Sequence, residues 1–258
     1  MQIKDVLRPI VRVARLTSLN PWQAFDNAWQ MPFYLKSMRD YAHLNTSDTF
    51  RIRLRNVYPI LNNRRSPAGA VKGQYFHQDM WAARKIFLRR PPSHMDIGSR
   101  VDGFVAHVLC FMPVTVIDIR PIRSNVAGLT FIQEDATELR EIASNSVDSL
   151  SSLHAAEHFG LGRYSDKIDP TACFKFMKTL ERVLAPEGRL YFSVPIGKER
   201  VEFNAHRVFA ARTVLDCMSK LKLVSFSHIS DGGDLFINSD PDEASQSWYA
   251  CGLFEFTK

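Results

Sequence analysis

The sequence lacks long hydrophobic runs, internal repeats and low-complexity tracts. No stretch of about 18 apolar residues occurs, so no transmembrane helix is predicted. The 258 residues include only four cysteines, which are widely scattered and show no zinc-knuckle spacing. Scattered cysteines favour structural thiols in a reducing compartment. The first residues also lack the apolar core and cleavage pattern of a secretory signal, so we expect a cytoplasmic protein.

Acidic residues are scarce in the first part of the chain. Residues 1–95 contain 16 Lys and Arg but only 5 Asp and Glu, whereas the remainder contains 17 and 22. Residues 3–19 have the pattern of a basic amphipathic helix, and Asn20 followed by Pro21 is a typical start for a second helix. A basic extension can contact phosphates, a nucleotide or the inner-membrane surface; a solvated helical face explains the same pattern.

Strand and helix patterns alternate after residue 93, which indicates an α/β fold with a mainly parallel sheet covered on both faces. The last two strands have no helix between them, so the final strand is expected to be antiparallel, at or near the sheet edge. The expected strands are 94–97, 114–117, 129–132, 147–153, 189–194, 223–228 and 249–256, and the expected helices are 75–88, 101–110, 137–143, 171–183 and 211–221.

A turn-rich linker at 61–73 and the paired prolines Pro91 and Pro92 separate the basic region from this pattern. The sequence therefore predicts two parts. Residues 1–92 form a mostly helical extension that contacts the substrate or acts as a lid. Residues 93–258 form a doubly wound, seven-stranded Rossmann-like domain.

Acidic residues end three successive predicted strands. Asp96 precedes Gly98 at the first strand-to-helix turn, where glycine lets the backbone approach a ligand. Asp118 follows 22 residues later, close to the interval typical of a ribose-binding acid, and Asp135 ends the third strand. Turn capping is the alternative explanation for each acid, because Asp is common after strands. NAD is an alternative ligand, but Arg100 replaces the second glycine of the dinucleotide pattern.

At these residues the chain resembles the class I S-adenosylmethionine-dependent methyltransferases. The resemblance continues through Ala155-Ala156-Glu157-His158, Leu180 to Leu190 with its Pro-Glu-Gly turn, and the terminal Gly252 to Lys258. More narrowly, it resembles an uncharacterised bacterial branch often associated with surface-polysaccharide synthesis. The resemblance implies that S-adenosylmethionine is bound by Asp96, Gly98, Ser99, Gly103, Asp118, Ile119, Asp135 and Ala136.

A histidine-rich segment follows the fourth predicted strand. On a helix, His154, Glu157 and His158 would share one face. The segment is similar to the Glu-x-x-Glu-His cluster of metal-dependent O-methyltransferases, with His154 in place of the first Glu and His206 as the distant partner. The resemblance implies a divalent metal, with zinc, iron or manganese favoured over magnesium. In a metal-free site, His154, His158 or His206 would act as the base, or Glu157 and His158 would only brace the segment.

The function expected from the sequence is methyl transfer to a sugar hydroxyl of a surface glycan or of its nucleotide- or lipid-linked precursor. One alternative is an RNA 2′-O-methyltransferase, which the basic extension would allow although no nucleic-acid recognition module is visible. A second is a non-catalytic, methyltransferase-like partner protein. A third is a zinc hydrolase, because His-x-x-Glu-His also matches the inverted zinc-peptidase pattern.

Overall fold

A computed structural model gives the fold and describes residues 21–258 except 62, 63, 65, 67 and 70. The expected helix at 3–19 lies outside these residues. The chain divides into two compact units, Met1–Gly69 and Ala70–Lys258. In the described part, no helix is both long and apolar enough to span a membrane.

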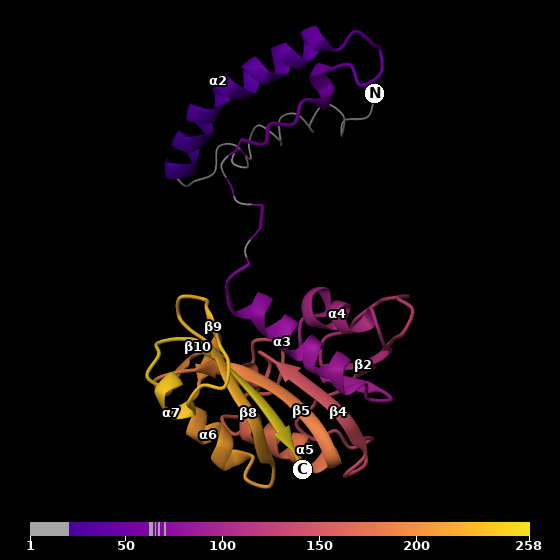
Figure 1. The fold of residues 1–258 in the computed structure, drawn as a ribbon, viewed down its shortest axis with the longest axis vertical. Coiled ribbons are helices and arrows are strands. Elements are labelled where there is room, and N and C mark those ends of the chain that lie inside the picture. Colours follow the sequence, from indigo (N-terminus) through magenta and orange to yellow (C-terminus); the bar gives the residue numbers. More distant parts are fainter. Residues whose placement is uncertain (1–20, 62–63, 65, 67, 70) are drawn as a thin grey trace. The chain divides into compact units, whose positions relative to one another are not determined.

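The first unit contains the helix α2 (Pro21–Leu44) and the short 3-10 turn η1 (Leu54–Asn56) (Figure 1). α2 begins at Pro21, as the sequence predicts, because proline fits the first helical position. After α2, exposed Phe50, Ile52 and Leu54 alternate with arginines 51, 53 and 55, so this segment combines apolar surface with positive charge.

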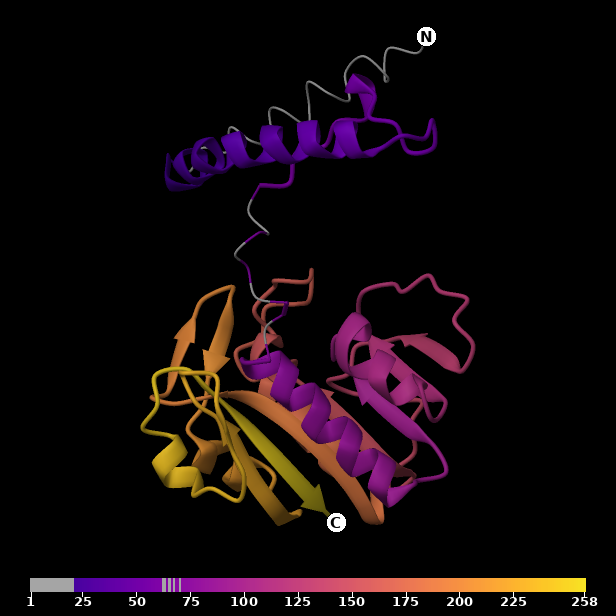
Figure 2. The ribbon, with the colours of Figure 1, turned by 45° about the horizontal axis from the view of Figure 1, so that its top comes forward.

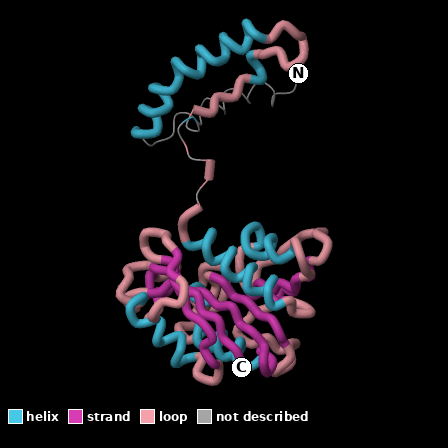
Figure 3. The backbone as a smooth tube through the Cα atoms, viewed as in Figure 1, coloured by secondary structure: helices cyan, strands magenta, loops and turns pink. Residues whose placement is uncertain are grey.

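The second unit is built on an eight-stranded sheet with the order β3-β2-β1-β4-β5-β10-β8-β9 (Figure 3). β3, β2, β1, β4 and β5 are parallel, whereas β10 runs antiparallel to both β5 and β8. The sheet strands are β1 (His94–Ile97), β2 (Val114–Asp118), β3 (Leu129–Gln133), β4 (Val147–Leu153), β5 (Leu184–Ile196), β8 (Lys222–Ile229), β9 (Leu235–Phe236) and β10 (Ala250–Thr257). The predicted α/β class and antiparallel last strand are confirmed, and the added eighth strand is the short β9.

Helices cover both faces of this sheet, and each face has its own hydrophobic cluster. Alternation along the strands explains the division: Ile97 and Ile117 point to one cluster, and Val114 and Val116 to the other. The first face is covered by α5 (Ala172–Val183) and α6 (Ala211–Cys217). The second is covered by α3 (Gln74–Arg89), the π-helical turn η3 (Val101–Val105) and α4 (Ala106–Leu109). Figure 2 shows α3 lying across the strands.

The domain boundary lies earlier than the sequence predicts. α3 was expected in the extension, but it packs on the sheet as part of the second unit. Lys85 pairs with Glu255 on β10 at 2.6 Å, and Arg89 forms a bidentate pair with Asp148 on β4. The remaining elements of the second unit lie outside the main sheet. They are the hairpin of β6 (Arg200–Glu202) and β7 (His206–Val208), and the short helix α7 (Pro241–Ala244).

The expected helix at 137–143 is wrong. This stretch forms turns, and Leu139 has a backbone φ of 45° that no right-handed helix accommodates. Three of its carbonyl groups, those of Glu138, Leu139 and Ile142, instead accept hydrogen bonds from the Arg182 side chain on α5. A helix is therefore replaced by turns fastened to α5.

Candidate functional site

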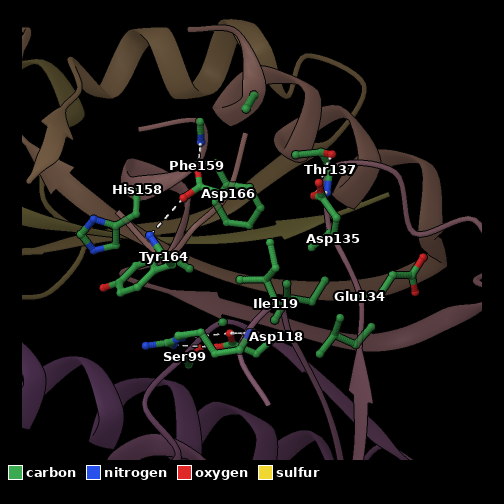
Figure 4. Close-up of a pocket in the computed structure, with 18 of the residues that line it drawn as sticks. Ser99, Asp118, Ile119, Glu134, Asp135, Thr137, His158, Phe159, Tyr164 and Asp166 are labelled. Carbon is green, nitrogen blue, oxygen red and sulfur yellow. Dashed lines mark hydrogen bonds and ion pairs between the residues drawn. The ribbon is translucent and has the colours of Figure 1, made fainter. Parts of the chain in front are cut away.

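A pocket of about 350 Å³ opens at the carboxyl ends of β1, β2, β3 and β4. In an open α/β sheet this edge is where ligands bind, since the strand order reverses there. Figure 4 shows Ser99 and Asp118 along one wall, with His158 and Tyr164 across the view from Asp135. The predicted cofactor residues Gly98, Ser99, Asp118, Ile119, Asp135 and Ala136 all line this pocket.

Asp96 lies beneath the first turn and does not itself line the pocket. Its fully buried carboxylate accepts hydrogen bonds from the backbone amide and hydroxyl of Ser99 and from the hydroxyl of Ser151. Burial raises the pKa of Asp96 to about 6, although these hydrogen bonds act in the opposite direction. Asp96 therefore shapes the turn from below, whereas the resemblance implied that it binds the cofactor.

Gly98 needs its lack of a side chain. Its φ is +73°, and an added Cβ would lie 2.9 Å from the Cβ of Ala155. Gly103 serves a different purpose, because a Cβ there would lie 2.6 Å from a carboxylate oxygen of Asp79 on α3. Gly103 thus allows α3 to pack closely on η3, and it does not line the pocket.

Asp118 ends β2 and is held by a residue that the sequence did not single out. Its Oδ1 accepts from the backbone amide of Arg120 at 2.8 Å and from Nε at 3.0 Å, and its Oδ2 accepts from Nη2 at 2.6 Å. The Arg120 guanidinium also lies 4.5 Å from the ring centre of Tyr164, a cation–π contact. Asp118 therefore lines the pocket, as expected, and also caps its own turn.

Asp135 also caps its own turn. Its Oδ1 accepts from the backbone amide and hydroxyl of Thr137 at 2.9 and 2.8 Å. The side chain is exposed on the pocket wall, and the adjacent Ala136 is buried beside it. The three acids thus gather at one edge of the sheet, two on the pocket and Asp96 below it.

The predicted helical face of the histidine segment is wrong. His154 has a left-handed φ of 52°, and only the 3-10 turn η4 (Ala156–His158) follows it. The turn nevertheless brings His154 Nδ1 within 2.8 Å of Glu157 Oε1, and both side chains are buried. Burial opposes a charge on His154, but the neighbouring Cys251 sulfur and Glu157 carboxylate favour it, and the pKa of His154 is raised.

His158 lies on the pocket wall. Its Nδ1 lies 2.7 Å from the carbonyl oxygen of Ala205, and the Tyr164 ring meets it edge-on at 5.6 Å. Burial lowers the pKa of His158 from its ordinary value. A carbonyl partner makes Nδ1 the donor, which leaves Nε2 as the unprotonated nitrogen of the neutral ring.

His206 is separate from this pocket. It begins β7, where its Nε2 lies 3.3 Å from Glu202 Oε2 and its ring lies 4.9 Å from that of Tyr249. Among the residues that the structure describes, no three His, Cys, Asp or Glu side chains are arranged to hold a metal ion. The set His154, Glu157, His158 and His206 therefore does not fit the expected metal site in this arrangement.

Sequence reasoning missed several pocket residues: Tyr75 comes from α3, and Arg120 and Thr137 follow the two predicted acids. Tyr164, from the glycine-rich loop after η4, also lines the pocket, as the position of this loop after the histidine segment suggests. The loop of Tyr164 is organised by Asp166, whose carboxylate accepts from the amides of Gly160, Gly162 and Tyr164. The Gly-x-Gly spacing is a visible signal for a tight loop beside the histidine segment.

The comparisons with known proteins agree with this architecture. The family model described as "Caenorhabditis protein of unknown function, DUF268" matches residues 123–231, less than half of the chain. No curated protein matches the chain. Among solved structures, the [4+2]-cyclase SpnF is similar at a TM-score of 0.50 and 12% identity, over 70% of this chain and 81% of that one.

Two further solved structures are methyltransferases with bound S-adenosylhomocysteine. The N-methyltransferase NodS from Bradyrhizobium japonicum has a TM-score of 0.49 and 15% identity over 71% of this chain and 87% of its own. The 1,6-didemethyltoxoflavin-N1-methyltransferase from Burkholderia thailandensis has a TM-score of 0.49 and 16% identity over 70% and 79%. The chain has a Rossmann-like α/β fold. Because the similar structures include one named as a cyclase, the fold does not by itself decide the reaction.

Proposed function

We propose that the chain is an S-adenosylmethionine-dependent methyltransferase that binds the cofactor in the pocket at the ends of β1 to β4. The observation that carries this proposal is the meeting of the Gly98 turn, Asp118 and Asp135 around one pocket. S-adenosylhomocysteine in two structures of similar fold is in line with it.

Each pocket residue contacts a different part of the cofactor in this proposal. In this proposal, Asp118 accepts hydrogen bonds from the ribose hydroxyls, and Asp135 accepts one from the adenine amino group. The Gly98 turn places backbone close to the ligand, with Ser99 beside it, and Ile119 and Ala136 supply apolar walls. The cofactor supplies a methyl group on a positively charged sulfur, so the protein needs to orient an acceptor and exclude water.

The acceptor that we propose is a hydroxyl, and His158 is the residue best suited to take its proton. An imidazole can accept a proton only when it is neutral, and the lowered pKa of His158 favours that form on the pocket wall. His154, with its raised pKa, positions the turn together with Glu157. The position of His206 outside the pocket lining gives no support to a catalytic role for it.

The acceptor hydroxyl that we propose belongs to a sugar of a lipid-linked precursor, because the surface of the first unit has features of a lipid-binding segment. The segment with Phe50, Ile52 and Leu54 presents apolar side chains between arginines, which is the combination that binds an anionic lipid surface. The same charges would contact phosphates of RNA, and strongly salt-dependent RNA binding would favour that alternative acceptor. The comparisons give no support to the narrower bacterial polysaccharide branch, since the matching family model is described for Caenorhabditis.

Calorimetric titration with S-adenosylhomocysteine tests the proposal. We expect one site per chain in the wild type and at least tenfold weaker binding in Asp118→Ala. Asp148→Ala is the matched control, because Asp148 lies at the start of β4, does not line the pocket, and pairs with Arg89 on α3. Absence of binding by the folded wild-type chain would leave the non-catalytic alternative in place and refute the cofactor site.

A further inference from the structure

Arg120 occupies the carboxylate that the proposed function assigns to the ribose. Asp118 is only 8% exposed, and the arginine contacts both of its oxygens through the main chain and the guanidinium. A bidentate arginine–carboxylate pair is among the stronger side-chain interactions, and it leaves few lone pairs of the carboxylate free. A ribose cannot use Oδ2 fully while Nη2 lies 2.6 Å from it.

The guanidinium has a second favourable partner. It lies over the ring of Tyr164, which the Asp166-organised loop brings from the β4 side of the pocket, and half of the Arg120 side chain is exposed. Arg120 can therefore leave Asp118 for solvent while it keeps the cation–π contact. The backbone hydrogen bond from Arg120 to Oδ1 holds the turn in place during such a movement.

From these contacts we propose that Arg120 is an internal competitor of the cofactor ribose for Asp118, and that it sets the affinity of the pocket for adenosyl ligands. Without a ligand the guanidinium neutralises a buried carboxylate that would otherwise keep only the backbone amide of Arg120 as a partner. When a ribose donates its hydroxyls to Asp118, the guanidinium moves aside onto Tyr164. Cofactor binding therefore carries the cost of breaking this pair. This inference rests on the proposed function of the pocket.

The test compares the affinity for adenosine and for S-adenosylhomocysteine in the full-length chain by calorimetry. Arg120→Gln removes the competing charge, and we expect it to bind both ligands about five times more tightly than the wild type, in line with the modest worth of half-exposed ion pairs. Arg120→Lys keeps the charge without the bidentate geometry, so its affinity for both ligands should lie between that of the wild type and that of Arg120→Gln. Arg163→Gln is the matched control, because Arg163 also lies near the Tyr164 ring but does not pair with Asp118.

The ribose hydroxyls provide a second comparison. 2′,3′-Dideoxyadenosine cannot donate to Asp118, so Arg120→Gln should leave its affinity unchanged while the affinity for adenosine increases. If Arg120→Gln and Arg120→Lys bind adenosine as weakly as the wild type or more weakly, Arg120 is not a competitor and the inference is wrong. If no folded variant binds any of these ligands, the proposed function fails and the inference fails with it.

Discussion

His94 and Asp96, two residues apart on β1, share one hydroxyl group, that of Ser151. His94 Nε2 lies 2.9 Å from Ser151 Oγ, which donates to Asp96 Oδ1 at 2.5 Å. Ser149 contacts the other imidazole nitrogen at 2.8 Å. Burial lowers the pKa of His94 to about 3 and raises that of Asp96 to about 6, so it disfavours the charged form of both. The base of the Gly98 turn is thus a buried polar network in which His94 is neutral and Asp96 takes up a proton more readily than a free carboxyl group.

His94 makes the fold sensitive to acid. The unfolded chain binds a proton at His94 below about pH 6.5, whereas the folded chain does so only near pH 3, so stability is lost as the pH falls between these values. Each pH unit in this window costs about 1.4 kcal/mol. We expect His94→Gln to be less stable than the wild type at pH 7, and this difference to shrink by about 2 kcal/mol at pH 5. Urea unfolding at both values measures it.

The exposed His43, at the end of α2, provides the control for this experiment. His43→Gln should leave the pH dependence of the unfolding free energy as it is in the wild type. If the unfolding free energies of the wild type and of His94→Gln differ by the same amount at pH 7 and pH 5, the pKa of His94 is not lowered in the folded chain.

The pair of His154 and Glu157 should stabilise the turn that carries His158. Both side chains are at least 96% buried, and removing one partner of a buried pair typically costs about 3–5 kcal/mol. We expect Glu157→Leu to lower the unfolding free energy by about this amount at pH 6. Because the pKa of His154 is raised, the contribution of the pair is complete below pH 6.5 and is lost as the pH rises through the folded-state value.

Glu202 offers a matched comparison, because it pairs with His206 at 3.3 Å but is 44% exposed. Glu202→Leu should change the unfolding free energy by less than about 1 kcal/mol. Equal losses in the two variants would mean that burial of the His154–Glu157 pair has no special effect on stability.

The sequence predicted the sheet better than the site. Short apolar runs such as Val114–Ile117 identify buried strands by composition, so β2 was predicted to within one residue of its observed end. The spacing of His154 and His158 suggested a helix because i, i+4 periodicity was assumed, but the left-handed φ of His154 depends on tertiary contacts. The pairing of Arg120 with Asp118 needs only local geometry, yet its position over Tyr164 joins two loops distant in sequence.

Chelation tests the expectation of a bound metal. His154 is engaged by Glu157, and His206 lies with Glu202 on the β6–β7 hairpin, so the four predicted ligands do not form a ligand set in this arrangement. We expect chain purified in EDTA to bind S-adenosylhomocysteine with the affinity of untreated chain and to unfold at the same temperature. Elemental analysis that finds one zinc, iron or manganese per chain, together with a fall in melting temperature on chelation, would contradict this.

Gly98 should be the position in the first turn least able to accept a side chain. Gly98→Ala forces a non-glycine residue to a φ of +73° and places its Cβ 2.9 Å from that of Ala155, a contact that requires the β1 and β4 turns to separate. We expect a loss of about 1–3 kcal/mol in unfolding free energy. Binding of S-adenosylhomocysteine should also weaken under conditions where the variant is fully folded, because the added side chain displaces the turn that lines the pocket.

Gly232→Ala is the control, since its nearest neighbours, two side-chain oxygens, lie at least 3.5 Å from an added Cβ. Wild-type affinity in a folded Gly98→Ala chain, measured by calorimetry, would show that the close approach of backbone at this turn does not matter for the ligand.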